Sequence, residues 1–180
     1  MAATIFYIVH HILVKTNLFL VGGMISRKMG TQDLGSIGGI YRKVPWLSVL
    51  FLIPALSLGG IPPLSGFFAK FALIKESVAV GNWVIVFTAS AVGLLTLYSM
   101  VKIWNEAFWK EVPDHSRSPD RRLPKAMLIP ASALALGTIL IGLIPTLLYD
   151  LAAEAAGQLK NPDIYIGKVL GNGTTESEPP

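Results

Sequence analysis

One stretch of this sequence, residues 46–79, is almost entirely apolar or small, yet it contains helix-breaking residues near its middle. A continuous helix rises ~1.5 Å per residue and would here be roughly 50 Å long, against a membrane hydrocarbon core of about 30 Å. Gly59 and Gly60 tolerate non-helical dihedrals, while Pro62 and Pro63 lack N–H donors. The stretch is therefore predicted to divide into two helices.

We expect this break over residues 59–66, with Gly66 closing it. An interrupted helix at membrane depth leaves backbone carbonyls without partners, and it persists only where protein or water satisfies them. Transporters use such discontinuous helices at their ion sites. The break thus indicates an ion pathway.

The composition places the chain in a membrane. Hydrophobic residues make up 52% and charged residues 14% of the 180 residues, and the mean hydropathy is +0.57. Apolar residues gather in blocks long enough to span a bilayer, which predicts an all-α integral membrane protein. The basic residues behind the net charge of +4 lie between these blocks, so topology explains them without a nucleic-acid partner.

About four membrane-spanning helices are expected, of which the second is the interrupted one. They are predicted within residues 1–150, at 3–25, 45–79, 83–108 and 125–149. Residues 151–170 are expected to add a short interfacial helix, and residues 171–180 a disordered polar tail.

Basic residues set the expected orientation, because membrane proteins concentrate Lys and Arg in cytoplasmic loops. The loops after the first and third spans carry Arg27, Lys28, Arg42, Lys43, Lys110, Arg117, Arg121, Arg122 and Lys125. Both loops lie on one face if four spans alternate. We therefore expect a multi-pass cell-membrane protein with these loops in the cytoplasm and both termini outside.

Lys70 is the ionisable residue predicted to lie deepest in the membrane. It precedes the Gly81 turn by eleven residues, or ~16 Å of helix, which is too far to reach the surface comfortably. A charge at the bilayer centre costs about 3 kcal/mol or more, so such a lysine indicates a function. Lys75 and Lys102 lie nearer to span ends, where a long side chain can reach water.

In the first span, His11 and Lys15 lie one helical turn apart on the same face. Histidine changes charge near neutral pH, and removal from water favours the neutral form of lysine, so both can exchange protons. We predict that they relay protons along a file of water. The alternative is that His11 is a polar residue packed between helices. His10 points about a hundred degrees away from this face and is assigned no role.

The sequence contains no pattern typical of a soluble enzyme. It has no nucleotide-binding glycine loop, no His/Glu metal spacing and no Ser/His/Asp set. Zero cysteines exclude thiolate zinc sites and cysteine-ligated iron–sulfur clusters. We therefore expect no cofactor, no metal and no redox or hydrolytic site in this chain.

Three motifs resemble a known family. They are residues 11–23, beginning His-Ile-Leu-Val-Lys; residues 34–45, with Gly-Ser-Ile-Gly-Gly-Ile-Tyr; and residues 56–70, with Gly-Gly-Ile-Pro-Pro-Leu-Ser-Gly-Phe-Phe-Ala-Lys. In this order they resemble the antiporter-like, proton-conducting membrane subunits shared by respiratory complex I and Mrp-type multisubunit Na+/H+ antiporters. The match runs over about residues 5–171, and its C-terminal part looks most like the D-type subunit of the Mrp antiporter.

The resemblance implies roles for individual residues. Lys70 in the interrupted helix, and His11 with Lys15 in the preceding one, would lie in the outer half of a hydrated proton path. The other subunits of an antiporter complex would be the partners, with H+ and Na+ as the ions. Family members begin with many more helices, so the chain resembles the last third of a subunit, and we expect transport to require the remaining helices.

Three functions stay open at this point. The chain is part of a Na+/H+ antiporter subunit, or part of the equivalent pumping subunit of NADH:quinone oxidoreductase, or a transport-silent membrane scaffold. The first two predict the same helices and differ in partners and in whether electron transfer drives the ion step. The C-terminal stretch favours the antiporter.

Overall fold

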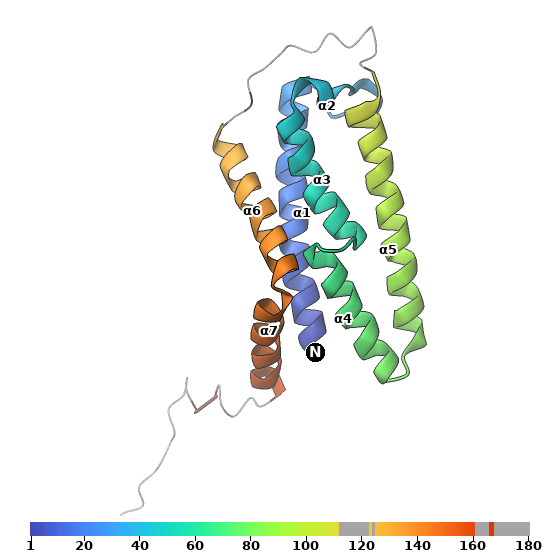
Figure 1. The fold of residues 1–180 in the computed structure, drawn as a ribbon, viewed down its shortest axis with the longest axis vertical. Helices are drawn as coiled ribbons and strands as arrows, with labels where there is room; N and C mark the ends of the chain where they lie inside the picture. The colour runs from blue at the N-terminus through green and yellow to red at the C-terminus, as the bar shows by residue number, and fades with distance from the viewer. Residues whose placement is uncertain (112–122, 124, 161–165, 168–180) are drawn as a thin grey trace, which may run out of the picture.

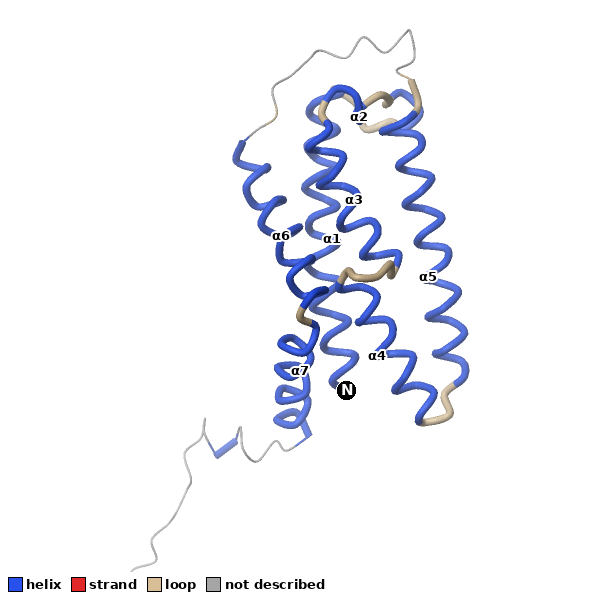
Figure 2. Tube along the Cα trace, viewed as in Figure 1, coloured by secondary structure: helices blue, strands red, loops and turns tan. Residues whose placement is uncertain are grey.

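The computed structural model of the chain describes residues 1–111, 123, 125–160 and 166–167 (Figure 1). All regular secondary structure in these residues is helical (Figure 2). The helices are α1 (Ala2–Met29), α2 (Ile40–Lys43), α3 (Pro45–Gly59), α4 (Ser65–Ala79), α5 (Trp83–Trp104), α6 (Lys125–Leu143) and α7 (Pro145–Lys160). A 3₁₀ turn (Leu34–Ser36) lies between α1 and α2, and a π-helical turn (Asn105–Trp109) extends α5.

Four segments run along the bundle in alternating directions: α1, then α3 followed by α4, then α5, then α6 (Figure 1). By length and composition, Ala2–Met29, Trp83–Trp109 and Ala126–Leu143 can each cross a membrane. Helix α3 is apolar but shorter, and α4 continues it beyond a non-helical linker. The predicted all-α membrane fold with an interrupted second span is confirmed.

Two helix boundaries differ from the prediction. Helix α1 continues past residue 25 to Met29 and ends where Gly30 adopts a left-handed conformation, with φ 72°. The helix expected over 125–149 ends at Leu143, and α7 begins at Pro145. Proline disrupts the interior of a helix but fits its first turn, so Pro145 starts a new helix earlier than expected.

Some predictions fall on parts of the chain outside the described residues. These parts are residues 112–122, 124, 161–165 and 168–180. They include the basic residues Arg117, Arg121 and Arg122 and the tail expected to be disordered.

Helix α1 is central to the bundle and packs against α3, α4, α6 and α7. Its buried residues include Ala3, Phe6, His10, Val14, Asn17, Val21 and Met24. They recur every three or four positions, which places them on one face of the helix. The Asn17 side-chain amide lies against the backbone of α6, and with its nitrogen toward Ala131 O and its oxygen toward Ala135 N each distance is 3.2 Å. Helix α5 lies at the side of the bundle, against α3 and α4.

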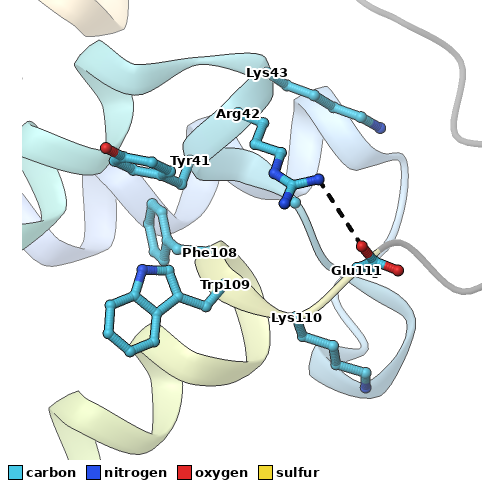
Figure 3. Close-up of a pocket in the computed structure, with 8 residues that line it drawn as sticks. Tyr41, Arg42, Lys43, Phe108, Trp109, Lys110 and Glu111 are labelled. Atoms are coloured by element: carbon cyan, nitrogen blue, oxygen red, sulfur yellow. Dashed lines mark ion pairs between the residues drawn. The ribbon is translucent and has the colours of Figure 1, made fainter.

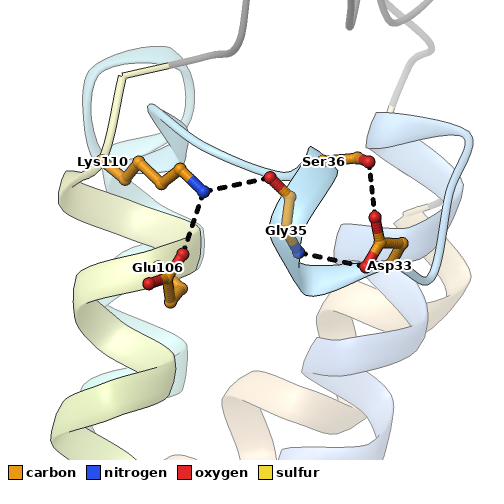
Figure 4. A network of polar contacts seen from close by, with 5 residues as sticks. All are labelled: Asp33, Gly35, Ser36, Glu106 and Lys110. Atoms are coloured by element: carbon orange, nitrogen blue, oxygen red, sulfur yellow. Dashed lines mark hydrogen bonds and ion pairs between the residues drawn. The ribbon is translucent and has the colours of Figure 1, made fainter.

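The connection from α1 to α2 is fastened to the end of α5 (Figure 4). Asp33 accepts hydrogen bonds from Ser36 Oγ at 2.6 Å and from Gly35 N at 3.2 Å, and these donors hold the pKa of the Asp33 carboxyl below its ordinary value. Lys110 Nζ donates to Gly35 O at 3.0 Å and to Glu106 Oε2 at 3.0 Å. The connection from α1 to α2 and the described residues that follow α5 therefore lie together at one end of the bundle.

Candidate functional site

The break in the second span has a defined backbone geometry. Helix α3 ends at Gly59, and Gly60 adopts a left-handed conformation with φ 87°. The N–H of Ile61 folds back onto Leu56 O at 3.1 Å. Helix α4 then begins at Ser65. The interruption spans residues 60–64, so it is shorter than the predicted 59–66, because Gly59 and Gly66 have helical conformations.

Pro62 and Pro63 lie inside this interruption, joined by a cis peptide bond. Both are exposed on the described chain, whereas Ser65 and Gly66 just beyond them are buried. The residues of the break were expected to face other protein or water rather than lipid. Ile61 and Leu64, on either side of the two prolines, are half-buried.

Lys70 reaches back from α4 to the end of α3. Its Nζ donates to Leu58 O at 2.8 Å and to Gly59 O at 3.2 Å. Carbonyls in the last turn of a helix have no partner within the helix and carry partial negative charge, so a cation is favourable there. A Cβ atom on Gly93 of α5 would lie 3.1 Å from this ammonium nitrogen, so α5 passes directly over it.

A chain of hydrogen bonds joins α1 to the same break. His10 is fully buried, and its Nδ1 lies 2.9 Å from Ser65 Oγ. Ser65 Oγ lies 3.1 Å from Ser57 Oγ, which accepts a hydrogen bond from Gly66 N at 3.1 Å. These hydrogen bonds tie the end of α3 to the start of α4. His10 Nε2 is also buried and has no hydrogen-bond partner among the described residues.

Close backbone packing fixes these half-helices. A Cβ atom on Gly66 would overlap Ser57 O, and one on Gly142 of α6 would overlap Pro63 O. A Cβ atom on Gly59 would lie 2.9 Å from Leu97 of α5. Glycine at these three positions lets α3, α5 and α6 approach the break closely.

His11 and Lys15 lie outside this hydrogen-bond chain. The His11 ring packs on Tyr7, with centroids 4.2 Å apart, and on His10 at 5.2 Å. Its Nε2 is buried, and no described residue pairs with it. Lys15 is exposed and lines a mostly apolar cavity of about 890 Å³ between α1 and α5. The structure thus brings Lys70 and His10 to the break and leaves Lys15 apart from it.

His10 is the residue that the sequence analysis overlooked. The sequence does indicate that His10 is buried. Phe6, His10, Val14 and Asn17 are spaced three or four residues apart, as on the buried face of a helix. The pair of His11 and Lys15 lies on a different face, so it does not point to His10. Buried polar residues on such a face need partners, and Ser57 and Ser65 supply them.

Comparison with known proteins assigns the family. The family described as "NADH:quinone oxidoreductase/Mrp antiporter, TM" matches residues 1–96. The chain belongs to this family. The D subunit of the Na+/H+ antiporter of Alkalihalophilus pseudofirmus is 44% identical over 169 residues, covering 94% of this chain and 34% of that protein. The NADH-quinone oxidoreductase subunit N 2 of Solidesulfovibrio magneticus is 33% identical, covering 88% of this chain and 33% of that protein.

A solved structure agrees with the family assignment. The Mrp complex from Dietzia sp. DQ12-45-1b contains a chain that matches with a TM-score of 0.85 and 34% identity. The match covers 95% of this chain and 40% of that one. The described helices therefore have the arrangement found in a multisubunit membrane complex. The chain spans about a third of the length of the curated relatives it matches.

Proposed function

We propose that this chain contributes part of a proton path to the membrane subunit of a multisubunit Na+/H+ antiporter. The observation that carries the proposal is the contact of Lys70 Nζ with Leu58 O and Gly59 O, at 2.8 and 3.2 Å, at a helix break inside a membrane bundle. The relatives named as the D subunit of a Na+/H+ antiporter support the choice of ion exchange.

The proposed mechanism depends on a reversible change of charge at Lys70. In its charged state the ammonium is held by two carbonyls at the end of α3. When it gives up a proton, this electrostatic contact weakens and the side chain is free to turn toward water. The two halves of the interrupted span thereby offer the lysine a charged and a neutral position, which a proton carrier requires.

Histidines on α1 extend the proposed path. His11 and Lys15 keep the roles predicted for them, with Lys15 facing the open cavity beside α1. His10 adds a link to the break, because its ring lies between Ser65 and His11. Neutral histidine has one donor and one acceptor nitrogen, so it can pass a proton between two neighbours.

The same proposal covers the topology and the partners. Residues 1–150 form the transmembrane region, residues 151–170 lie at the interface, and the basic loops face the cytoplasm. The partners are the remaining helices of the subunit, the other subunits of the complex, the lipid bilayer, and the ions H+ and Na+. The chain supplies no redox or hydrolytic site of its own.

A second candidate is the equivalent pumping subunit of an NADH:quinone oxidoreductase. The 33% identity to a relative with that name supports it, and the 44% identity to an antiporter D subunit favours the first candidate. The third possibility is a transport-silent scaffold.

A chimera distinguishes the three. The last third of the A. pseudofirmus D subunit is replaced by this chain, and the protein is expressed with the rest of its complex. Everted membrane vesicles are energised, and the dissipation of ΔpH is recorded as Na+ is added. Exchange that needs no NADH oxidation supports the antiporter. The same replacement in the N 2 subunit of the S. magneticus oxidoreductase tests the second candidate, which predicts proton pumping during NADH oxidation. Assembly without activity in both complexes supports the scaffold.

A further inference from the structure

A pocket of about 570 Å³ opens where α2 meets the end of α5 (Figure 3). Its lining includes Tyr41, Arg42, Lys43, Phe108, Trp109 and Glu111. Because Trp83–Trp109 is long and apolar enough to cross a membrane, its end places the pocket at the level of the membrane–water interface. None of these residues belongs to the candidate proton path.

The pocket is preformed by backbone contacts between segments that are distant in sequence. Gly39 N donates to Lys110 O at 2.7 Å. A Cβ atom on Gly38 would lie 2.7 Å from Glu111 O, so the two backbones touch. Phe108 is 1% exposed and stacks on Trp104 with centroids 4.7 Å apart, which makes a firm apolar base.

Two cations in the pocket are available to a ligand. Lys110 is already bound to Glu106 and Gly35 O, and its ammonium points away from Arg42 (Figure 3). Arg42 Nη1 lies 3.9 Å from Glu111 Oε1, and both side chains are more than 80% exposed, at 82% and 88%. Such an exposed pair contributes little and is easily replaced. Lys43 is exposed and has no partner among the described residues.

Exposed aromatic rings lie beside these cations. Tyr41 is 53% and Trp109 67% exposed. Rings with one polar group favour the level of lipid headgroups, where they contact both the glycerol region and water. Cations that can bind phosphate, next to rings that can contact glycerol and the first acyl carbons, match the two parts of a phospholipid.

We propose that this pocket binds the headgroup of an anionic phospholipid, with its phosphate held by Arg42 and Lys43. Arg and Lys make strong charge-assisted hydrogen bonds to phosphate, and basic pockets between membrane helices are suited to anionic headgroups. A lipid fits better than free phosphate because the exposed rings of Tyr41 and Trp109 line the pocket beside the two cations. The phosphate replaces Glu111 as the partner of Arg42.

Native mass spectrometry of the full chain in detergent tests the site, with phosphatidylglycerol as the probe and phosphatidylcholine as the uncharged comparison. The double variant Arg42→Gln/Lys43→Gln is expected to weaken phosphatidylglycerol binding about tenfold or more, since both side chains would make charge-assisted hydrogen bonds to the phosphate. The matched control, Arg27→Gln/Lys102→Gln, removes the same charge from exposed positions outside the pocket and should change binding less than about twofold.

A charge-preserving variant keeps the test independent of misfolding. Arg42→Lys/Lys43→Arg should retain most of the affinity, and excess inorganic phosphate should not displace the lipid. Equal losses in the two charge-removing variants would overturn the proposal, since the attraction would then be a property of the whole surface. Displacement by inorganic phosphate would also overturn it. Unchanged phosphatidylglycerol binding in Arg42→Gln/Lys43→Gln would overturn it as well.

Discussion

At the scale of single residues, the proposed proton path depends on which polar side chains reach the helix break. Lys70 was predicted from its depth in the apolar run, and the structure places it on two carbonyls of the break. His10 was not predicted, because a sequence places a residue on a face of a helix without saying which neighbour covers that face. The partners Ser57 and Ser65 belong to other helices.

His10 is expected to stabilise the joint between α1 and the break. His10→Ala removes the 2.9 Å contact with Ser65 Oγ and should lower the free energy of unfolding by about 1–3 kcal/mol. His10→Asn retains a hydrogen-bonding group near the Nδ1 position and should cost less. The measurement is thermal unfolding of the chain in detergent, followed by circular dichroism. His11→Ala serves as the control, because the buried Nε2 of His11 has no hydrogen-bond partner among the described residues.

A double-mutant cycle separates this contact from general packing. His10→Ala and Ser65→Ala should together cost less than the sum of the two single changes, because both remove the same hydrogen bond. Additive losses would show that the 2.9 Å contact contributes nothing of its own.

At the scale of helices, the sequence predicted that the second span breaks but overestimated the length of the break. Glycine and proline mark where a helix can end, yet α3 continues through Gly59 and α4 includes Gly66. The fourth span shows the opposite error, since Pro145 starts a new helix inside a predicted continuous one. Apolar content alone does not distinguish one long helix from two consecutive ones.

Gly66 provides the test at this scale. A Cβ atom there would overlap Ser57 O, so Gly66→Ala should force the two half-helices apart and destabilise the chain by about 1–3 kcal/mol. Gly137→Ala in α6 is the matched control, because a Cβ atom there meets nothing within 4 Å. That change should be neutral or stabilise the chain by about 0.5–1 kcal/mol, as expected for a helix interior. Equal melting temperatures for the two variants would contradict the close packing of the break.

At the scale of the whole molecule, the C-terminal end of α1 and the end of the π-helical turn after α5 lie at the same end of the bundle, where Lys110 Nζ contacts Gly35 O (Figure 1). The direction of insertion remains a prediction from the positions of Lys and Arg. The contacts with other subunits could not be predicted in detail. Apolar side chains on the exposed faces of α1 and α5 fit lipid and protein equally well, so the sequence does not say which of the two covers them.

The chain has no cysteine, so single-cysteine variants report its topology directly. Gly35→Cys should react with a membrane-impermeant maleimide only from the cytoplasmic side. Val80→Cys, in the turn between α4 and α5, should react only from the outside, and it leaves the capping side chain of Asn82 intact. Ser118 is expected on the same side as Gly35, although it lies outside the described residues. Reaction of both cysteines from one side would refute the four-span arrangement.

The most direct test of the central claim is Na+-dependent ΔpH dissipation in vesicles that contain matched amounts of assembled complex. Lys70→Ala should abolish exchange while protein level and assembly stay near those of the unmodified chain. Lys70→Arg should also impair it, because a guanidinium keeps its proton and fixes the charge that must change. Lys75→Ala, nearer the end of α4, should retain most of the exchange. Unimpaired exchange in both Lys70 variants would show that this lysine only holds the break together and that the proposed proton path is wrong.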